Sequence, residues 1–492
     1  MPRHIFHGAT QVYRARPAPT AAHVAGNGVR PGLFKRFEAS NGTPIADPLF
    51  ISAARFIMPF RPLRIALISE HASPLAAIGS VDAGGQNVYV RHVAVCLARA
   101  GHQVDVLTRR DDPALLAAVD MRPGVRVVHV PAGPARFVPK EQLLQHMPAF
   151  TDAARELFQN SIDYDLIHAN FFMSGLVGLR LKELFGVPMA MTFHALGLVR
   201  REHQGADDGF PPLRVDIERC IVRNADRLIA ECPQDAMDLR RLYRARPEAI
   251  STVPCGVDLA EFPPTGKAAA RRTLGLADDE FVILQLGRMV PRKGVDNVIR
   301  ALALLPRETR ARLLVVGGES PDPDPRLTPE IGRLQALADA CGVGDRVTFT
   351  GQRPRQDLPG CYAAADVFVT TPWYEPFGIT PLEAMACGIP VIGSAVGGIK
   401  HSVVDGVTGF LVPPRHPAAL AERLRQLHAN PWLRQAMGRS GVRRVRANFT
   451  WDRVAADLAD IYESICARQP RGVERRPASR RRRASQGAGV QA

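Results

Sequence analysis

The chain has 492 residues, of which 46% are hydrophobic and 23% charged, as in globular proteins with two or more domains. No apolar run approaches the ~20 residues that cross a bilayer, and the N-terminus lacks the apolar core of a secretory signal. The eight cysteines form no CxxC pair and show no zinc spacing. These features argue against integral-membrane and disulfide-framework classes, and we expect a soluble, cytoplasmic protein with free thiols.

The net charge of +15 is concentrated at the two ends of the chain. Residues 1–60 carry +5 and residues 469–492 carry +6, which leaves +4 for the 408 residues between them. The Arg-rich segment "SRRRRAS" is typical of a solvated, disordered tail, with binding to an anionic surface as the alternative. The distribution therefore gives little support to specific nucleic-acid binding.

The first 60 residues show no periodicity of helix or strand. We interpret them as a disordered N-terminal extension, or as the result of a start codon assigned too early, since only five residues separate Met58 from the first predicted strand.

From Leu63 onward, short apolar runs alternate with helical segments such as 87–101, which ends on Gly101 as a plausible C′ glycine. The runs are typical of buried strands and lie at 64–69, 104–109, 125–130, 166–170, 189–194, 227–232 and 250–255. This alternation predicts a parallel, doubly wound sheet.

A second series of strands follows a Gly- and Pro-containing linker. It lies at 281–288, 312–318, 346–351, 366–372, 390–395 and 409–412. We therefore predict an α/β protein with two Rossmann-like domains facing across a cleft, with ligands at the carboxyl ends of the strands. The predicted parts are an N-terminal domain (61–258), a C-terminal domain (259–449), a final amphipathic helix (450–468) and a basic tail (469–492).

Several polar or glycine residues follow predicted strands. Gly84 and Gly85 precede a helix, where backbone can approach an anion, although a plain tight turn gives the same pattern. Arg288 and Lys293 lie in a strand-to-helix loop and suit a diphosphate, with two solvated loop cations as the alternative. His194 ends another strand, where a structural histidine is the simpler interpretation.

The stretch "EPFGITPLE" contains Glu375 and Glu383. Thr380 as N-cap, Pro381 at N1 and Glu383 at N3 match a capping box, and Gly388 with Pro390 predicts a short helix. Glu375 precedes the helix and has no such structural explanation. No His, Cys or Asp joins the two glutamates at ligand spacing, so we predict no metal site.

Taken together and in this order, the motifs resemble those of family-4 retaining glycosyltransferases of the GT-B fold. The resemblance extends from about Arg64 to Gln469. It is strongest for the branch with sucrose-phosphate synthase and mycothiol (inositol-phosphate) glycosyltransferases, through "DAGGQNVYV", "VPKEQL", "TFHALG" and "NADRLIAECPQD".

The resemblance implies roles for individual residues. His194, Glu375, Arg288 and Lys293 would form the catalytic group, with both cations on the donor diphosphate. Glu375 would contact the donor sugar, His194 would reach it from the other domain, and Glu383 would bind the ribose. The nucleotide-sugar site would comprise Gly84, Gly85, Arg288, Lys293, Glu375, Phe377, Gly378, Ile379, Thr380 and Glu383, with the base near Gly351–Arg353.

The resemblance also implies the chemistry. Two cations and a helix N-terminus can stabilise a departing diphosphate without a divalent metal. We expect a hexose to move from a nucleotide-diphosphate sugar, first of all a UDP-sugar, to an acceptor hydroxyl with retention at the anomeric carbon. No cofactor is expected, and the leaving phosphate would help take the acceptor's proton.

The acceptor is expected to be a phosphorylated sugar or polyol, bound by Gln86, Lys140 and Arg214. Two positions depart from the mycothiol enzyme, which has a tyrosine at Phe171 and a threonine at Ala195. Two phosphate-facing hydroxyls are thus missing, and hexose phosphate, lipid and polysaccharide acceptors remain open beside inositol phosphate.

Two other classes of function remain. A GT-B epimerase or a glycoside phosphorylase could use the same fold and the same diphosphate groups. A non-enzymatic, basic-tailed binding protein would fit the tail, but the sequence lacks the aromatic–basic interleaving of RNA-stacking modules.

Overall fold

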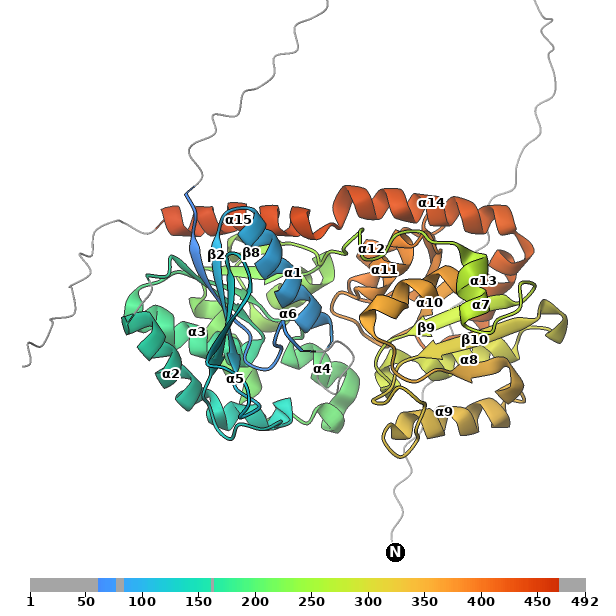
Figure 1. Cartoon of the computed structure of the whole chain (residues 1–492), viewed down its shortest axis with the longest axis horizontal. Helices are drawn as coiled ribbons and strands as arrows, with labels where there is room; N and C mark the ends of the chain where they lie inside the picture. The colour runs from blue at the N-terminus through green and yellow to red at the C-terminus, as the bar shows by residue number, and fades with distance from the viewer. Residues whose placement is uncertain (1–60, 77–83, 161–162, 469–492) are drawn as a thin grey trace, which may run out of the picture. The chain divides into compact units, whose positions relative to one another are not determined.

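The computed structural model describes residues 61–76, 84–160 and 163–468, which contain two sheets (Figure 1). The predicted N-terminal extension (1–60) and basic tail (469–492) lie outside the described residues. The first sheet has the strand order β3-β4-β2-β1-β5-β6-β7-β8. Its strands are β1 (Arg64–Ile68), β2 (Gln103–Arg109), β3 (Ala118–Arg122), β4 (Val125–Val130), β5 (Leu166–Asn170), β6 (Met189–Thr192), β7 (Arg227–Ala230) and β8 (Ile250–Thr252).

The second sheet is entirely parallel, with the order β11-β10-β9-β12-β13-β14. Its strands are β9 (Phe281–Leu286), β10 (Ala311–Val316), β11 (Val347–Phe349), β12 (Val367–Thr370), β13 (Val391–Ser394) and β14 (Gly409–Val412). The predicted α/β fold with two Rossmann-like sheets is confirmed. Each predicted strand is present, and many end two or three residues earlier than predicted, which places the residues after them in the connecting loops.

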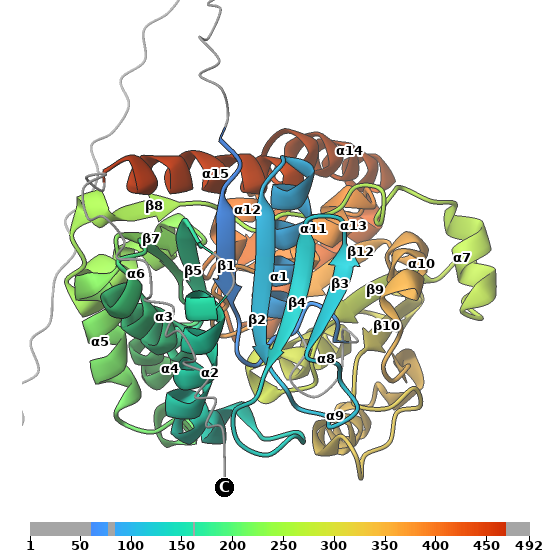
Figure 2. The same cartoon turned by 60° about the vertical axis from the view of Figure 1, so that its left-hand side comes forward.

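Helices cover both faces of the first sheet (Figures 1 and 2). One face carries α1 (Gly85–Arg99) and α15 (Trp451–Ala467), and the other carries α2 (Met147–Asn160), α3 (Phe172–Phe185) and α5 (Arg214–Asn224). Near-continuous burial of strands such as β5 follows from this double covering. The sheet, these helices, α4 (Gly197–Gln204) and α6 (Pro233–Tyr243) are called the N-terminal lobe below.

The second sheet is also covered on both faces and, with its helices, is called the C-terminal lobe. Its helices are α7 (Lys267–Thr273), α8 (Val295–Ala303), α9 (Pro329–Ala340), α10 (Leu358–Ala364), α11 (Thr380–Ala386), α12 (Ile399–Ser402), α13 (Pro417–Ala429) and α14 (Pro431–Asn448). One hydrophobic core runs from α1 and α15 into α10 and α11, so apolar packing is continuous between the lobes.

Strand β3 was not predicted. It pairs antiparallel with β4 at the edge of the first sheet, as Figure 2 shows. Its side chains alternate between exposed and half-buried, so the run "AVDMR" lacks the apolar content of the buried strands. An antiparallel edge strand is therefore poorly visible in a search for buried runs.

The predicted final helix is α15, and it follows α14 directly. Val257, in the connection between the lobes, forms a β-bridge with Thr450, which lies between the two helices. The segment that leads into the C-terminal lobe and the segment that leaves it therefore lie side by side. Among the described residues, no helix combines the length and apolar character needed to traverse a bilayer.

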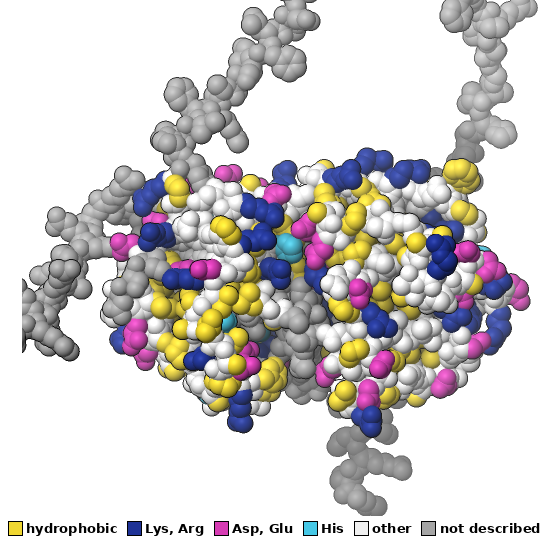
Figure 3. Space-filling model, in the orientation of Figure 1, with side chains coloured by type: hydrophobic (Ala, Val, Ile, Leu, Met, Phe, Trp, Pro, Cys, Tyr) yellow, Lys and Arg dark blue, Asp and Glu magenta, His cyan; other side chains and the backbone are white. Residues whose placement is uncertain are grey.

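Helix α14 is a basic element within the folded part. It contains five arginines and no acidic residue, and Figure 3 shows Lys and Arg side chains gathered over it. Arg444 is structural, since it donates to the carbonyls of Ser402 and His401 at 2.7 and 2.6 Å. Arg439, Arg443 and Arg446 are exposed.

Helix α15 is tied to the N-terminal lobe by a buried polar contact. The hydroxyl of Tyr462 lies 2.7 Å from Nδ1 of His168, whose Nε2 lies 2.9 Å from Oγ1 of Thr192. Burial lowers the pKa of His168 to about 3, so its ring is neutral and one nitrogen must accept.

Replacing Tyr462 by Phe should therefore destabilise the fold, because a buried ring nitrogen loses its partner. We expect the free energy of unfolding to fall by about 1–3 kcal/mol in urea titration. The control is Asp460→Asn, an exposed change on the same helix that should stay within about 0.5 kcal/mol. Equal stability of the Tyr462→Phe variant and the parent would show that the contact does not hold α15.

Candidate functional site

A cavity of about 320 Å³ is lined by both lobes. The N-terminal lobe contributes residues that follow β1, β5, β6 and β7 and the start of α1, and the C-terminal lobe contributes the loops after β9 and β12. In each sheet the strand order reverses here, beside β1 and β5 and beside β9 and β12. Such switch points are where open α/β sheets bind ligands.

The cavity brings together nearly all of the residues singled out from the sequence. Those on its wall are Gly84, Gly85, Gln86, Lys140, His194, Arg288, Lys293, Glu375, Phe377, Gly378, Ile379, Thr380 and Glu383. Arg214 is the exception and does not line the cavity.

Glu375 is held by cations from the loop after β9. Its Oε2 lies 2.5 Å from Nζ of Lys293 and 3.5 Å from Nη1 of Arg292. Burial alone would raise the pKa of Glu375, but Lys293 and Arg292 hold it below its ordinary value. Burial lowers the pKa of Lys293 to about 8, although Glu375 favours its charged form. The pair thus forms a charged cluster with Arg288 on the same wall.

Glu383 is held by a different set of partners. Its Oε1 lies 2.9 Å from Nη1 of Arg355, and its Oε2 accepts from the Tyr362 hydroxyl at 2.8 Å. Arg355 also binds Glu261 through two contacts of 2.6 and 2.9 Å. The two glutamates of "EPFGITPLE" therefore have separate partners.

The predicted capping box is wrong. Helix α11 begins at Thr380, its N-cap is Ile379, and no side chain caps it. Glu383 lies one position too far along to reach the N-cap amide, and its carboxylate is drawn instead to Arg355 and Tyr362. The predicted early end is confirmed, since the helix stops at Ala386 before Gly388, whose φ is +79°.

His194 projects from the end of β6 and contacts two polar side chains. Its Nδ1 lies 3.0 Å from Oε1 of Glu231, and its Nε2 lies 3.0 Å from Oδ1 of Asn170. The ring of Tyr89 packs edge-on against it at 4.8 Å between centroids. His194 is therefore a fixed part of the cavity wall.

The residues proposed for the acceptor have different environments. Lys140 lines the cavity at the start of a 3₁₀ turn, and Nε2 of Gln86 donates to Oγ of Ser69 at 3.2 Å. Arg214 is 1% exposed and its Nε donates to Oε1 of Glu218 at 2.7 Å. Its guanidinium lies 4.6–5.0 Å from the ring centroids of Phe171, Phe172 and Phe210. Phe171 and Phe210 line the cavity, so Arg214 lies behind an aromatic wall.

Several residues of the site were missed. Arg292 precedes Lys293 in "PRKG" and could have been noted for its charge. No sequence pattern pointed to Arg355 or Glu231, because the residues that they contact are distant in the sequence. Across the described part of the chain, no group of three or more His, Cys, Asp or Glu residues is arranged to hold a metal ion.

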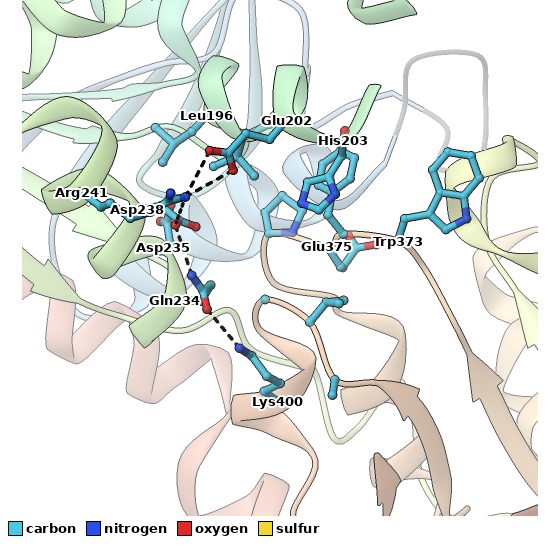
Figure 4. A pocket seen from close by; sticks show the side chains of 17 residues that line it. Leu196, Glu202, His203, Gln234, Asp235, Asp238, Arg241, Trp373, Glu375 and Lys400 are labelled. Carbon is cyan, nitrogen blue, oxygen red and sulfur yellow. Dashed lines mark hydrogen bonds and ion pairs between the residues drawn. The ribbon is translucent and has the colours of Figure 1, made fainter. Parts of the chain in front are cut away.

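A second cavity, of about 250 Å³, borders the segment 373–376 (Figure 4). Nζ of Lys400 in the C-terminal lobe donates to Oε1 of Gln234 in the N-terminal lobe at 3.0 Å. The ring of His203 stacks on Tyr374 at 4.9 Å, and Gln204 donates to the Tyr374 hydroxyl at 2.8 Å. The segment that carries Glu375 is thus fixed by both lobes.

The same segment packs directly on Gly397 and Gly398. The Gly398 amide donates to the carbonyl of Pro376 at 3.2 Å. A Cβ at Gly398 would lie 2.4 Å from the carbonyl oxygen of Phe377, and one at Gly397 would lie 1.7 Å from that of Glu375. The two glycines are therefore required by the close approach of backbone.

Comparisons with known proteins agree with this architecture. The family model described as Glycosyltransferase Family 4 matches residues 83–261, and the model described as Glycosyl transferases group 1 matches residues 266–444. The D-inositol 3-phosphate glycosyltransferase of Saccharomonospora viridis is 39% identical over 412 residues, which are 82% of this chain and 95% of that protein. The protein of the same name from Actinosynnema mirum is 40% identical over 407 residues, 81% of this chain and 96% of that one.

A solved structure has a sequence identity to this chain close to that of these relatives. Sucrose-phosphate synthase from Thermosynechococcus elongatus matches with a TM-score of 0.76 and 38% identity, over 83% of this chain and 100% of that one.

The contact at Gly398 leads to a prediction. Gly398→Ala should fold, because the φ of Gly398 is −68°, but its methyl group should displace the segment 375–377. We expect glycosyl transfer to fall by on the order of 100-fold, since displacements near 1 Å have such effects. Gly360→Ala, where a Cβ meets open space, is the control and should keep its activity. Unchanged transfer in the Gly398→Ala variant would contradict this account.

The two family models divide the site between them. His194 and Gly84–Gln86 fall within the range of the first model, and Arg288, Lys293 and Glu375 fall within that of the second. The cavity joins both groups of residues, and the relatives match over nearly their whole length. The chain therefore belongs to the family-4 glycosyltransferases of the GT-B fold, and it is a glycosyltransferase.

Proposed function

We propose that this protein moves a hexose from a nucleotide-diphosphate sugar to a hydroxyl of a phosphorylated polyol or sugar, with retention at the anomeric carbon. The observation that carries the proposal is the cationic wall of Arg288, Arg292 and Lys293 facing Glu375 within one cavity. A buried cluster of this kind suits a diphosphate, while the carboxylate beside it suits sugar hydroxyls.

In the proposed reaction the bond between the anomeric carbon and the diphosphate breaks, and the acceptor oxygen bonds to that carbon on the same face. The acceptor's proton passes to an oxygen of the leaving phosphate. Arg288 and Lys293 stabilise the departing charge. Helix α11 has only seven residues, so its N-terminus contributes less than the two cations. Stabilisation by side chains in place of a metal ion is part of the proposal.

Relatives and the cavity both support the choice of acceptor. The two relatives above are named D-inositol 3-phosphate glycosyltransferases, and Lys140 provides a cation on the N-terminal wall. Phe171 and Ala195 offer no hydroxyl, and Arg214 is paired with Glu218. The names of these relatives lead us to propose an inositol phosphate as the first acceptor to test, while the missing hydroxyls and the pairing of Arg214 keep hexose phosphates beside it. The scattered cysteines and ordinary composition favour action in the cytoplasm.

A donor screen tests the proposal. UDP-, GDP- and ADP-sugars at about 100 times Kd should each stabilise the protein by about 2.7 kcal/mol if they bind, and we expect a UDP-sugar to do so in thermal denaturation. Glu383→Gln should weaken the shift if Glu383 holds the ribose. NMR of the product should show a retained anomer, with and without EDTA. An inverted product, turnover without an acceptor, or the absence of any stabilisation would each contradict the proposal.

The low pKa of Lys293 predicts a pH dependence of donor binding. Below pH 8 the ammonium is charged in the free protein, whereas above pH 8 the diphosphate must draw a proton onto Lys293 as it binds. The Kd for UDP, measured by calorimetry, should therefore rise by up to about tenfold per pH unit above 8. Lys293→Arg stays charged and should give a flat profile, even with weaker binding. An equally steep profile in the arginine variant would assign the effect to another group.

A further inference from the structure

The ring of His194 faces two hydrogen-bond acceptors. Glu231 presents Oε1 to Nδ1 and Asn170 presents Oδ1 to Nε2, each at 3.0 Å. The orientation of the Asn170 amide is set independently, because its Nδ2 lies 3.4 Å from the carbonyl oxygens of both Ile68 and His168. A neutral imidazole has one N–H and one lone pair, so it can satisfy only one of these acceptors. An imidazolium satisfies both.

The burial of Glu231 also favours a positively charged partner. The side chains of His194 and Glu231 are only 9% and 5% exposed, and a buried carboxylate is costly unless it is paired. Cys255 donates its thiol to the same Oε1 at 3.1 Å, but it brings no charge. Burial would raise the pKa of Glu231, yet His194 and Cys255 hold it below its ordinary value. Among the described residues, His194, with Nδ1 3.0 Å from Oε1, is the one side chain in contact with this carboxylate that could bring it a positive charge.

In the part of the chain that the structure describes, the other groups facing the pair bring no second cation. The Asp235 carboxylate accepts from the Glu231 amide at 3.0 Å, and burial together with the charge of Glu231 raises the pKa of Asp235 to about 7. Burial and the charge of His194 keep the pKa of His168 at about 3, so that ring is neutral. Burial raises the pKa of the Tyr89 phenol well above its ordinary value, so the hydroxyl keeps its proton. Glu375 acts on Glu231 through space, but it is paired with Lys293.

The backbone shows that the position of this ring is imposed by its surroundings. His194 has φ +57°, in the left-handed region that non-glycine residues rarely adopt. Such conformations persist where the surrounding contacts over-determine them. Here the turn after β6 brings the ring between Glu231, after β7, and Asn170, at the end of β5.

We propose that Glu231 and Asn170 are positioning residues that hold His194 as an imidazolium in the wall of the cavity. The catalytic consequence rests on the proposed function: His194 would face the donor as a cation from the N-terminal lobe, opposite the cations of the C-terminal lobe. A carboxylate at position 231 would then act through His194, without itself contacting the sugar.

The protonation of His194 is measured in the free protein by NMR of ¹⁵N-histidine-labelled samples at pH 7. His194→Gln identifies the signals by their loss. We expect both ring nitrogens to be protonated in the parent protein. In Glu231→Gln, which can still accept from Cys255, one nitrogen should lose its proton. Glu231→Asp keeps the charge and should restore the doubly protonated ring at least in part.

Transfer kinetics provide a second measurement. Glu231→Gln should lower kcat/KM about tenfold at pH 8 and move the alkaline limb of its pH profile to lower pH, because the imidazolium is needed and has lost its carboxylate. In a His194→Gln background the same substitution should have little further effect. The matched control is Asp238→Asn, which removes a carboxylate from α6 beside the second cavity (Figure 4). It should leave both the ring signals and the profile unchanged.

A singly protonated His194 in the parent protein, or identical signals in the parent and Glu231→Gln, would overturn the proposal. The NMR measurement needs no substrate, so it separates this inference from the proposed function. A doubly protonated ring in a protein that binds no nucleotide sugar would refute the function and support the inference about Glu231.

Discussion

The site depends on one constraint: each buried charged side chain must be paired with an opposite charge from another segment of the chain. Lys293 comes from the loop after β9 and Glu375 from the loop after β12, and their contact of 2.5 Å joins two neighbouring strands at their carboxyl ends. Neither charge is tolerable alone at this depth. The same rule joins Glu383 to Arg355, and the proposed imidazolium of His194 would extend it to Glu231. Each pair fixes two separate segments of the chain, so the cavity is shaped before any ligand enters.

This constraint explains why the glycines of "AVGG" accompany the glutamates. The segment 375–377 must lie where Glu375 can reach Lys293, and that place leaves no room for a side chain at Gly397 or Gly398. On its other side, Tyr374 is held by His203 and Gln204 of the N-terminal lobe. Backbone packing, charge pairing and contact between the lobes therefore act on one short segment.

The fold could be predicted from the sequence because buried parallel strands are continuous apolar runs. Such a run can be recognised in the sequence without knowing which strands it pairs with. The site was predictable to the extent that its residues follow those strands, as Arg288, Lys293 and His194 do. Long-range pairing was not predictable in the same way. Glu383 matched a local capping pattern, but Arg355, 28 residues away in the chain, takes its carboxylate. Strand β3 was not predicted because an exposed edge strand lacks such an apolar run.

Arg214 shows the same limit of sequence-based prediction, next to the cavity wall formed by the N-terminal lobe. A basic residue at that position invites the interpretation of a phosphate ligand, yet burial forces it to find a carboxylate, and Glu218 lies one turn away on α5. Phe171 and Phe210 then cover the pair, and their rings in turn form the cavity wall. A tyrosine at position 171 would place a hydroxyl on that ring, whereas phenylalanine leaves the wall apolar. This part of the cavity wall therefore combines apolar rings with the cation of Lys140, and the guanidinium of Arg214 packs behind those rings.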